Sequence, residues 1–177
     1  NVETAEWLAG MARTYGIRYS CMLIADRLNE ATAARYRAVF ADGYLEPQSH
    51  SYTHDPIPSA YWASHQSPPW SEERLSARDT AENYEREFRD SMTAIGDWFP
   101  DSRVLTFAAS NNTLSTGAAS YLRTLYYAVR CGNGGMQAIS AASPSVWFPG
   151  VNDNPRTDNN GTATPGSWQN LSVVSLR

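Results

Sequence analysis

Two of the three histidines in this chain stand four residues apart, His50 and His54, within the segment SHSYTH at 49–54. Four residues span about one turn of a helix, so both imidazole rings can point at a single ion. Neutral imidazole is a good ligand for zinc and similar metals. The spacing therefore predicts a divalent-metal site, and two hydrogen-bonded histidines in a turn are the alternative interpretation.

The elements that must position this pair alternate between helix and strand. Apolar residues at helical spacing predict two helices, with Thr4 and Asn29 as N-caps and Gly16 after the first helix. Short apolar runs predict the strands. The predicted order is helix, strand, helix, strand over 4–16, 17–25, 29–41 and 44–48. The pair thus directly follows the end of a strand.

Residues 55–70 hold four prolines and three large aromatic residues, which predicts a rigid irregular loop because proline lacks the backbone donor that helices and sheets need. Ser71 is expected to cap one long amphipathic helix, which Pro100 ends. We then expect a strand, a short helix, a strand, an aperiodic segment and a closing strand over 103–108, 116–126, 127–130, 131–168 and 171–176. This alternation predicts an α/β fold whose sites lie beyond the carboxyl ends of parallel strands.

Composition excludes several classes of protein. The 177 residues are 42% hydrophobic and 18% charged, which suits one folded domain rather than a disordered chain. The net charge of −4 argues against a nucleic-acid partner, and no apolar run is long enough to cross a bilayer. Two cysteines, Cys21 and Cys131, could form one disulfide or be separate buried thiols. Three glycosylation-type triplets, beginning at residues 111, 160 and 170, hint at a secreted protein.

The segment GYLEPQSHSYTH at 43–54 resembles the second motif of the polysaccharide deacetylases, the NodB-homology group that includes carbohydrate esterase family four. That motif reads His-Ser/Thr-x-x-His and follows a strand. As a pattern of elements the resemblance covers residues 1–130, although only the histidine pair is a specific motif. It implies a distorted (β/α) barrel in a single domain over 1–177, truncated at its N-terminus, with a long irregular loop region over 131–168.

The resemblance also implies chemistry. A divalent metal, usually zinc, would be held by His50, His54 and an Asp, and the enzyme would hydrolyse N-acetyl groups of an N-acetylated polysaccharide outside the cell, at the cell surface or in the periplasm. The family's Thr-Phe-Asp-Asp motif would fall just before Asn1, so the catalytic acid and base are unknown from these residues. Asp26 and Asp55 are candidate substitute ligands, and surface or capping roles are the alternative.

The chain departs from the family's later motifs. The place of the third motif, at 108–112, reads AASNN and lacks the family's Arg and Pro. No histidine follows His65, so the family's final His, its general acid, has no match; His65 is either a substitute acid or a solvated loop residue. These departures leave two alternatives open: a catalytically inactive carbohydrate-binding relative, and a metal-dependent amidase with another substrate.

Aromatic residues offer a candidate substrate surface. Tyr61, Trp62 and Trp70 lie in the proline-rich loop next to the histidine pair, and Trp147 lies in the aperiodic segment. Flat aromatic faces stack on the apolar faces of sugar rings, so these residues are predicted to bind substrate. The alternative is that the rings anchor long loops to the barrel. Two further tryptophans at helical apolar positions are expected in the core: Trp7 and Trp98.

Overall fold

The computed structural model describes residues 1–131 and 137–138. Two predictions from the sequence lie outside these residues: the closing strand at 171–176 and the substrate-binding role of Trp147. Nearly all of the predicted irregular region at 131–168 lies outside them as well.

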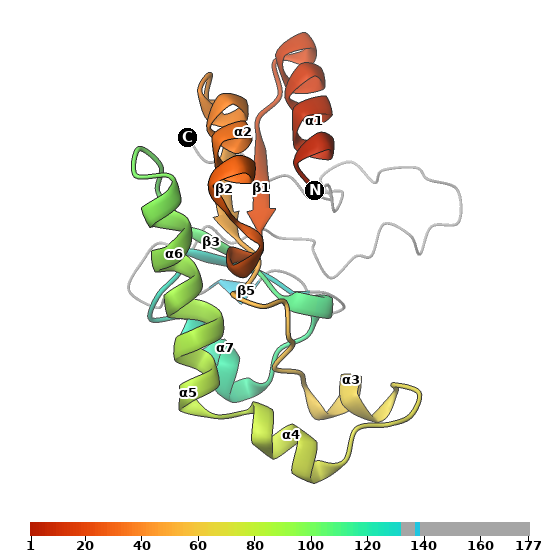
Figure 1. Ribbon diagram of the computed structural model, residues 1–177. Helices are drawn as coiled ribbons and strands as arrows, with labels where there is room; N and C mark the ends of the chain where they lie inside the picture. The colour runs from red at the N-terminus through yellow and green to blue at the C-terminus, as the bar shows by residue number, and fades with distance from the viewer. Residues whose placement is uncertain (132–136, 139–177) are drawn as a thin grey trace, which may run out of the picture.

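In the described part of the chain, five strands form one sheet in the order β1-β2-β3-β4-β5 (Figure 1). The strands are β1 (Tyr19–Leu23), β2 (Leu45–Ser49), β3 (Thr106–Ala108), β4 (Ala128–Arg130) and β5 (Gln137–Ala138). The first four are parallel, and β5 runs antiparallel to β4. Ser49 at the end of β2 pairs with Leu23 on one side and with Phe107 on the other. The carboxyl ends of three strands therefore meet where the histidine segment begins.

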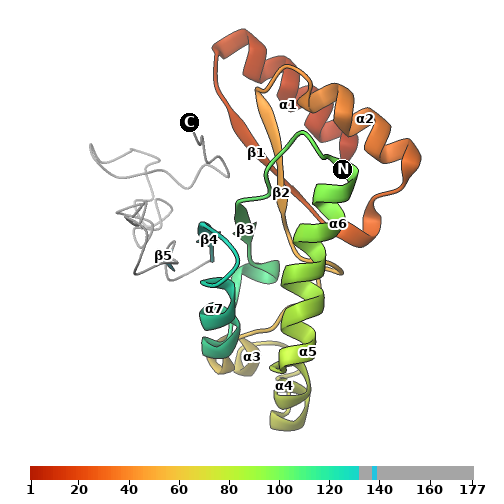
Figure 2. The same ribbon diagram turned by 90° about the vertical axis from the view of Figure 1, so that its left-hand side faces the viewer.

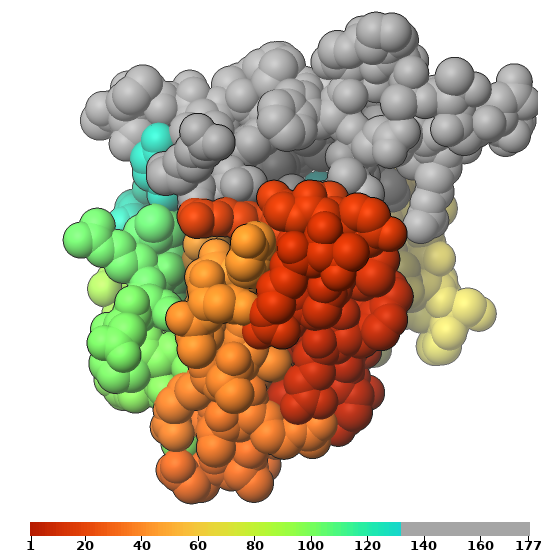
Figure 3. Space-filling model, turned by 90° about the horizontal axis from the view of Figure 1, so that it is seen from above, coloured from red at the N-terminus to blue at the C-terminus, as the bar shows by residue number. Residues whose placement is uncertain are grey.

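Helices alternate with the parallel strands. They are α1 (Val2–Tyr15), α2 (Glu30–Phe40), α3 (Ala60–Ser64), α4 (Glu72–Arg78), α5 (Ala81–Tyr84), the π-helical segment η2 (Glu85–Asp90), α6 (Ser91–Trp98) and α7 (Thr116–Leu122), with 3₁₀ turns η1 (Ala25–Arg27) and η3 (Ser110–Asn112). Helices α1 and α2 pack side by side (Figures 1 and 3). Figure 2 shows α5, η2 and α6 in line with one another, running along the strands. Helices α3 and α4 lie at the opposite end from α1 and α2.

The core lies between the sheet and these helices. Its largest fully buried apolar side chains come from β2, β3, α6 and α7: Leu45, Phe107, Ile95 and Leu122. Phe107 packs edge-on against Phe88 with ring centroids 5.1 Å apart and lies 5.3 Å from Tyr126. Burial raises the pKa of Tyr126, and its hydroxyl donates to the Phe88 carbonyl at 2.7 Å. The helical stretch from α5 to α6 is thus fixed to the sheet by apolar contact and by a buried hydrogen bond.

The beginning of α1 differs from the prediction. Its N-cap is Asn1, whose side chain accepts from the Thr4 N–H at 2.9 Å, so Thr4 lies inside the helix. The prediction that Trp7 lies in the core is wrong, because this side chain is 64% exposed. Helix α1 instead buries a face of small side chains, Val2 and the alanines at 5, 9 and 12. Trp98 is only partly buried and packs against the core.

The single long helix predicted after Ser71 is interrupted. Ser71 caps α4 as expected, since its hydroxyl accepts from the Arg74 N–H at 3.2 Å. Helix α4 ends at Arg78, and the Thr80 side chain then caps α5 by accepting from the Asn83 N–H at 3.3 Å. The Asn83 amide donates back to carbonyls at the end of α4, which satisfies groups that a helix terminus leaves unpaired.

The proline-rich segment at 55–70 is irregular except for the five-residue helix α3, which the sequence analysis missed. Ser59 caps this helix by accepting from the Trp62 N–H at 3.2 Å. Cys21 and Cys131 are separate thiols, which decides between the two predicted alternatives. Among the described residues no helix has both the length and the apolar character needed to cross a membrane.

Candidate metal centre

The histidine segment leaves the sheet as a tight loop. The His50 N–H still donates to the Leu23 carbonyl at 2.7 Å, which continues the pairing of β2 with β1. The next residue, Ser51, has a φ of 74°, and His54 has a φ of 69°. The pair therefore lies on a loop rather than on a helical turn, and the backbone reverses through two residues in the left-handed region. The Ser51 hydroxyl closes the loop by accepting from the His54 N–H at 2.8 Å.

This loop still brings the two imidazole rings together. The Nε2 atoms of His50 and His54 lie 3.1 Å apart, and the ring centroids lie 4.7 Å apart at an interplanar angle of 71°. Two nitrogen ligands at about 2.0–2.1 Å from a tetrahedral zinc ion would be about 3.3 Å apart. The spacing of the two nitrogens therefore fits a shared divalent cation, and it equally permits a hydrogen bond between the rings in the metal-free chain.

The other nitrogen of His50 is held by the backbone. His50 Nδ1 lies 2.8 Å from the Ala108 carbonyl at the end of β3, so Nδ1 carries the proton and donates it. This bond leaves the Nε2 lone pair directed at His54, as in metal sites where the second ring nitrogen fixes the tautomer. Burial lowers the pKa of His50, and the nearby His54 acts in the same direction, although the hydrogen bond to Ala108 opposes both. Both effects favour the neutral ring, which is the form that binds metals.

Hydroxyl groups tie the loop to neighbouring elements. Ser49 and Ser91 share a buried hydrogen bond with 2.7 Å between their oxygens. Ser51 and Ser110 share another at 3.0 Å, which joins the loop to η3 after β3. The ends of β2 and β3 and the beginning of α6 therefore hold the start of the loop in place.

Neither candidate carboxylate joins the pair. Asp55 forms an ion pair with Arg78 at 3.0 Å, so its side chain is engaged elsewhere. Asp26 lies in η1, where its backbone N–H donates to the Tyr52 carbonyl at 3.0 Å. Within residues 1–131 and 137–138, no group of three His, Cys, Asp or Glu side chains is arranged to hold a metal ion. The described part of the chain supplies two candidate ligands rather than a complete set.

The third histidine is engaged within its own helix. His65 ends α3, and its Nδ1 donates to the Tyr61 carbonyl at 2.8 Å. Its ring lies against the Tyr61 ring with centroids 4.2 Å apart. These contacts give His65 a capping role at the end of an exposed helix. The structure therefore favours the solvated loop residue over the substitute acid for His65.

The predicted substrate aromatics fall into two groups. Tyr61 is 71% exposed on α3 and is open to a ligand. Trp62 and Trp70 instead meet edge-on with centroids 5.7 Å apart, and the Arg74 guanidinium lies over the Trp70 ring at 3.6 Å. These two tryptophans pack α3 against the end of the segment, so the structure favours the loop-anchoring alternative for them.

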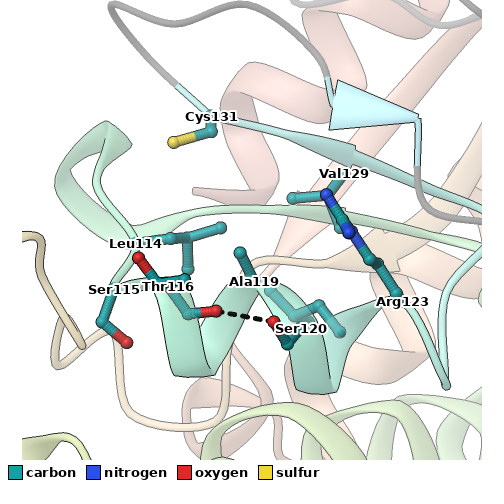
Figure 4. A pocket seen from close by; sticks show the side chains of 9 residues that line it. Leu114, Ser115, Thr116, Ala119, Ser120, Arg123, Val129 and Cys131 are labelled. Carbon is teal, nitrogen blue, oxygen red and sulfur yellow. Dashed lines mark hydrogen bonds between the residues drawn. The ribbon is translucent and has the colours of Figure 1, made fainter.

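A pocket of about 270 Å³ lies beside α7 (Figure 4). It is lined by residues of α7 and its flanks, by Val129 of β4 and by Cys131, and neither histidine of the pair contributes to it. Its side chains are a mixture of apolar groups and hydroxyls with one arginine, Arg123. The pocket and the histidine pair are therefore separate features.

The sequence prediction missed two residues that contact the loop on either side of His54. Glu87 is fully buried in η2, and both of its carboxylate oxygens accept hydrogen bonds from Thr53. Arg78 holds Asp55 on the other side of His54. No local signal singles out Glu87, because it stands within the charged run EREFRD at 85–90 and its partner Thr53 lies 34 residues away in the sequence.

Comparison with known proteins gives a clear result for the fold. No family model matches the sequence, and no curated protein matches it either. Among solved structures, the chain is similar to BC0361, a polysaccharide deacetylase from Bacillus cereus, with a TM-score of 0.50 and 15% identity over 72% of this chain and 34% of that one. It is also similar to the Xyl-CE4 domain of a multidomain xylanase from the hindgut metagenome of Trinervitermes trinervoides, with a TM-score of 0.51 and 18% identity over 70% of this chain and 49% of that one.

These likenesses confirm the predicted fold class, an α/β fold of the distorted-barrel type found in polysaccharide deacetylases. The resemblance suspected from the histidine motif is thus confirmed at the level of fold. The chain spans about a third to a half of the length of these structures.

Proposed function

We propose that this chain is part of a metal-dependent deacetylase in which His50 and His54 are metal ligands. The observation that carries the proposal is the 3.1 Å separation of the two Nε2 atoms, together with the Ala108 carbonyl that fixes the tautomer of His50. The fold likeness to a polysaccharide deacetylase adds independent support. We infer that the remaining ligand and the catalytic base come from outside the described residues.

The proposed reaction is hydrolysis of N-acetyl groups on a polysaccharide. A divalent ion, with zinc as our first choice, would supply a Lewis acid that polarises the amide carbonyl and activates water. The part of this chain would be to hold the two imidazole rings at the carboxyl ends of β2 and β3 with their Nε2 atoms facing each other. Sites in parallel α/β folds lie at this edge of the sheet.

We further propose that the substrate is a neutral or cationic sugar polymer. The chain has a net charge of −4, which disfavours an acidic polymer. Exposed Tyr61 offers a flat face of the kind that stacks on sugar rings. An extracellular, cell-surface or periplasmic location suits a cell-wall or extracellular polysaccharide and belongs to the same proposal.

Zinc titration of the full chain tests the metal site. We expect wild-type protein to bind one zinc ion, and His54→Ala to lose at least tenfold in affinity. His65→Ala is the matched control, because it removes the exposed histidine outside the pair and should bind as wild type does. If His54→Ala binds zinc as tightly as wild type, the metal site is wrong. Acetate release from an N-acetylated polysaccharide, and its loss on adding a chelator, then tests the reaction.

A non-catalytic carbohydrate-binding protein is the second candidate. It is favoured by the two-ligand set in the described residues and by the exposed ring of Tyr61. This alternative predicts glycan binding that survives a chelator and is lost in Tyr61→Ala. A metal-dependent amidase would instead release product from small amides, and a panel of substrates separates it from a polysaccharide deacetylase.

A further inference from the structure

Side chains from α4 and η2 contact the chain on both sides of His54. On the N-terminal side, Glu87 Oε2 accepts from the Thr53 N–H at 3.0 Å, and Oε1 accepts from the Thr53 hydroxyl at 2.8 Å. The Glu87 backbone carbonyl also accepts from the Tyr52 N–H at 3.1 Å. One residue thus makes three hydrogen bonds to the two residues that precede His54.

Arg78 does the same on the C-terminal side. Its Nη2 lies 3.0 Å from the Asp55 carboxylate and donates to the Asp55 carbonyl at 3.3 Å. Its Nε donates to the Pro56 carbonyl at 3.5 Å. The Arg78 side chain is only 16% exposed, whereas the Asp55 side chain is 48% exposed.

The contacts of Glu87 and Arg78 with the loop belong to one hydrogen-bond network. Asn83 Oδ1 accepts from Arg78 Nη1 at 3.3 Å and from Arg86 Nη2 at 2.8 Å. Arg86 Nε in turn donates to Glu87 Oε1 at 3.1 Å, which gives the carboxylate a cationic partner. Glu87 is completely buried. A buried carboxylate costs free energy even when paired, and apolar replacements of buried ion pairs are often neutral or stabilising. Stability alone therefore does not account for Glu87 at this position.

The backbone conformation at His54 requires contacts that maintain it. A φ of 69° is uncommon for a residue with a side chain and persists only where the surroundings impose it. Glu87 lies in the π-helical segment η2, and π-helical segments are rare and often occur at functional sites. The contacts on Thr53 and Asp55 act on this conformation from both sides of His54, in addition to the bond that the His54 N–H donates to the Ser51 hydroxyl.

We propose that Glu87 is the positioning residue of His54: together with Arg78, it holds the loop so that Nε2 of His54 faces Nε2 of His50. The inference deepens the proposed function and rests on it for the role of the metal. Its geometric part, the approach of the two rings, concerns the metal-free chain as well. Glu87 therefore acts on the pair through Thr53 and does not contact the metal.

The main test compares Glu87→Gln with Glu85→Gln in the full chain. Glu85 lies in the same π-helical segment, but it is exposed and pairs with Arg89 at 2.6 Å, so it is a matched control. Loss of partners that orient metal ligands typically lowers metal affinity by about 10–100-fold. We expect Glu87→Gln to weaken zinc binding by about that factor and Glu85→Gln to change it less than about twofold.

A second pair of variants distinguishes loss of positioning from misfolding. Thr53→Val removes the hydroxyl that Glu87 accepts from, whereas Thr53→Ser keeps it. We expect weaker zinc binding in Thr53→Val and near wild-type binding in Thr53→Ser. A merely structural role predicts that affinity follows stability, so Ile95→Val, which trims a buried side chain of α6, serves as a destabilised variant expected to keep its zinc affinity.

Nitrogen NMR of the imidazole rings in metal-free protein separates the two proposals. We expect the signals of the paired Nε2 atoms to change in Glu87→Gln and Thr53→Val and to stay unchanged in Glu85→Gln. If the wild type fails to bind zinc but the ring signals change in this way, the metal function is wrong and the positioning role stands. If the ring signals and zinc affinity of both variants match the wild type, the positioning role is overturned.

Discussion

A cluster of three polar side chains joins α4 and α5 to α7, and Gly117 lies against it. The Tyr84 hydroxyl donates to Asp79, and the Ser115 hydroxyl donates to the same carboxylate oxygen at 2.5 Å. Burial, followed by Asp79, raises the pKa of Tyr84 to about 12, so the phenol stays protonated as a donor at neutral pH. A Cβ at Gly117 would overlap the Tyr84 hydroxyl oxygen and lie 3.3 Å from Asp79 Oδ1. We therefore predict that Gly117→Ala breaks the bond between Tyr84 and Asp79.

The magnitude follows from two opposing effects. Replacing glycine by alanine in a helix stabilises it by up to about 1 kcal/mol. Loss of a hydrogen bond to a charged group costs about 1.5–3 kcal/mol, and forcing an extra methyl group into a packed site adds to that cost. Gly117→Ala should therefore lower the free energy of unfolding by about 1–3 kcal/mol. Gly96→Ala in α6 is the matched control, because nothing lies within 4 Å of its added Cβ, and it should stabilise the chain.

Urea denaturation of a double-mutant cycle provides the assay. In a Tyr84→Phe background the hydroxyl is absent, so the same Gly117→Ala change should be neutral or stabilising by up to about 1 kcal/mol. The decisive result is that Gly117→Ala destabilises the wild type and does not destabilise the Tyr84→Phe background. The reasoning is refuted if Gly117→Ala stabilises wild type as Gly96→Ala does, or if it destabilises both Tyr84 backgrounds equally.

Two further predictions concern buried polar groups. Asn83→Ala should lower the free energy of unfolding measured by urea denaturation by about 1–3 kcal/mol, because the carbonyls of Ala77 and Arg78 at the end of α4 lose their hydrogen-bond donor, the Asn83 amide. Burial raises the pKa of the Cys21 thiol from 9.0 to about 11, so the unfolded thiol ionises first and stability should fall as pH rises from about 9 towards 11. Unfolding midpoints of wild type and Cys21→Ala across this range check the sign, since only the wild type should show this contribution.

Local sequence signals predicted most of the elements correctly. Asn29 does cap α2, with a full capping box to Thr32, and Ser71 caps α4. Both signals act over three residues, so no tertiary information is needed to see them. The burial of α1 could not be predicted in this way, because Trp7 and the alanine face are both plausible core-facing sides. Contact with α2 selects the alanine face, since small side chains let two helices approach closely.

The break in the long helix shows a second limit. The stepwise apolar pattern continues across Asp79 and Thr80, so periodicity alone predicts one helix. Thr80 followed three residues later by Asn83 is a capping signal that outweighs this pattern, because the hydrogen bonds of Asn83 satisfy the end of α4 and the beginning of α5 together. The break then leads into η2, which presents Glu87 to the histidine loop.

The spacing of the two histidines is compatible with a helical turn or with a loop, and the choice changes which residues belong to the site. In a helical turn, only Tyr52 would point away from a shared ion, and Ser51 and Thr53 would lie beside the histidine face. In the loop that forms, the intervening hydroxyls of Ser51 and Thr53 point inward to Ser110 and Glu87, which lie 59 and 34 residues further along the chain. The convergence of the rings is therefore a tertiary property: the motif supplies the imidazoles, and contacts from η3 and η2 supply their alignment.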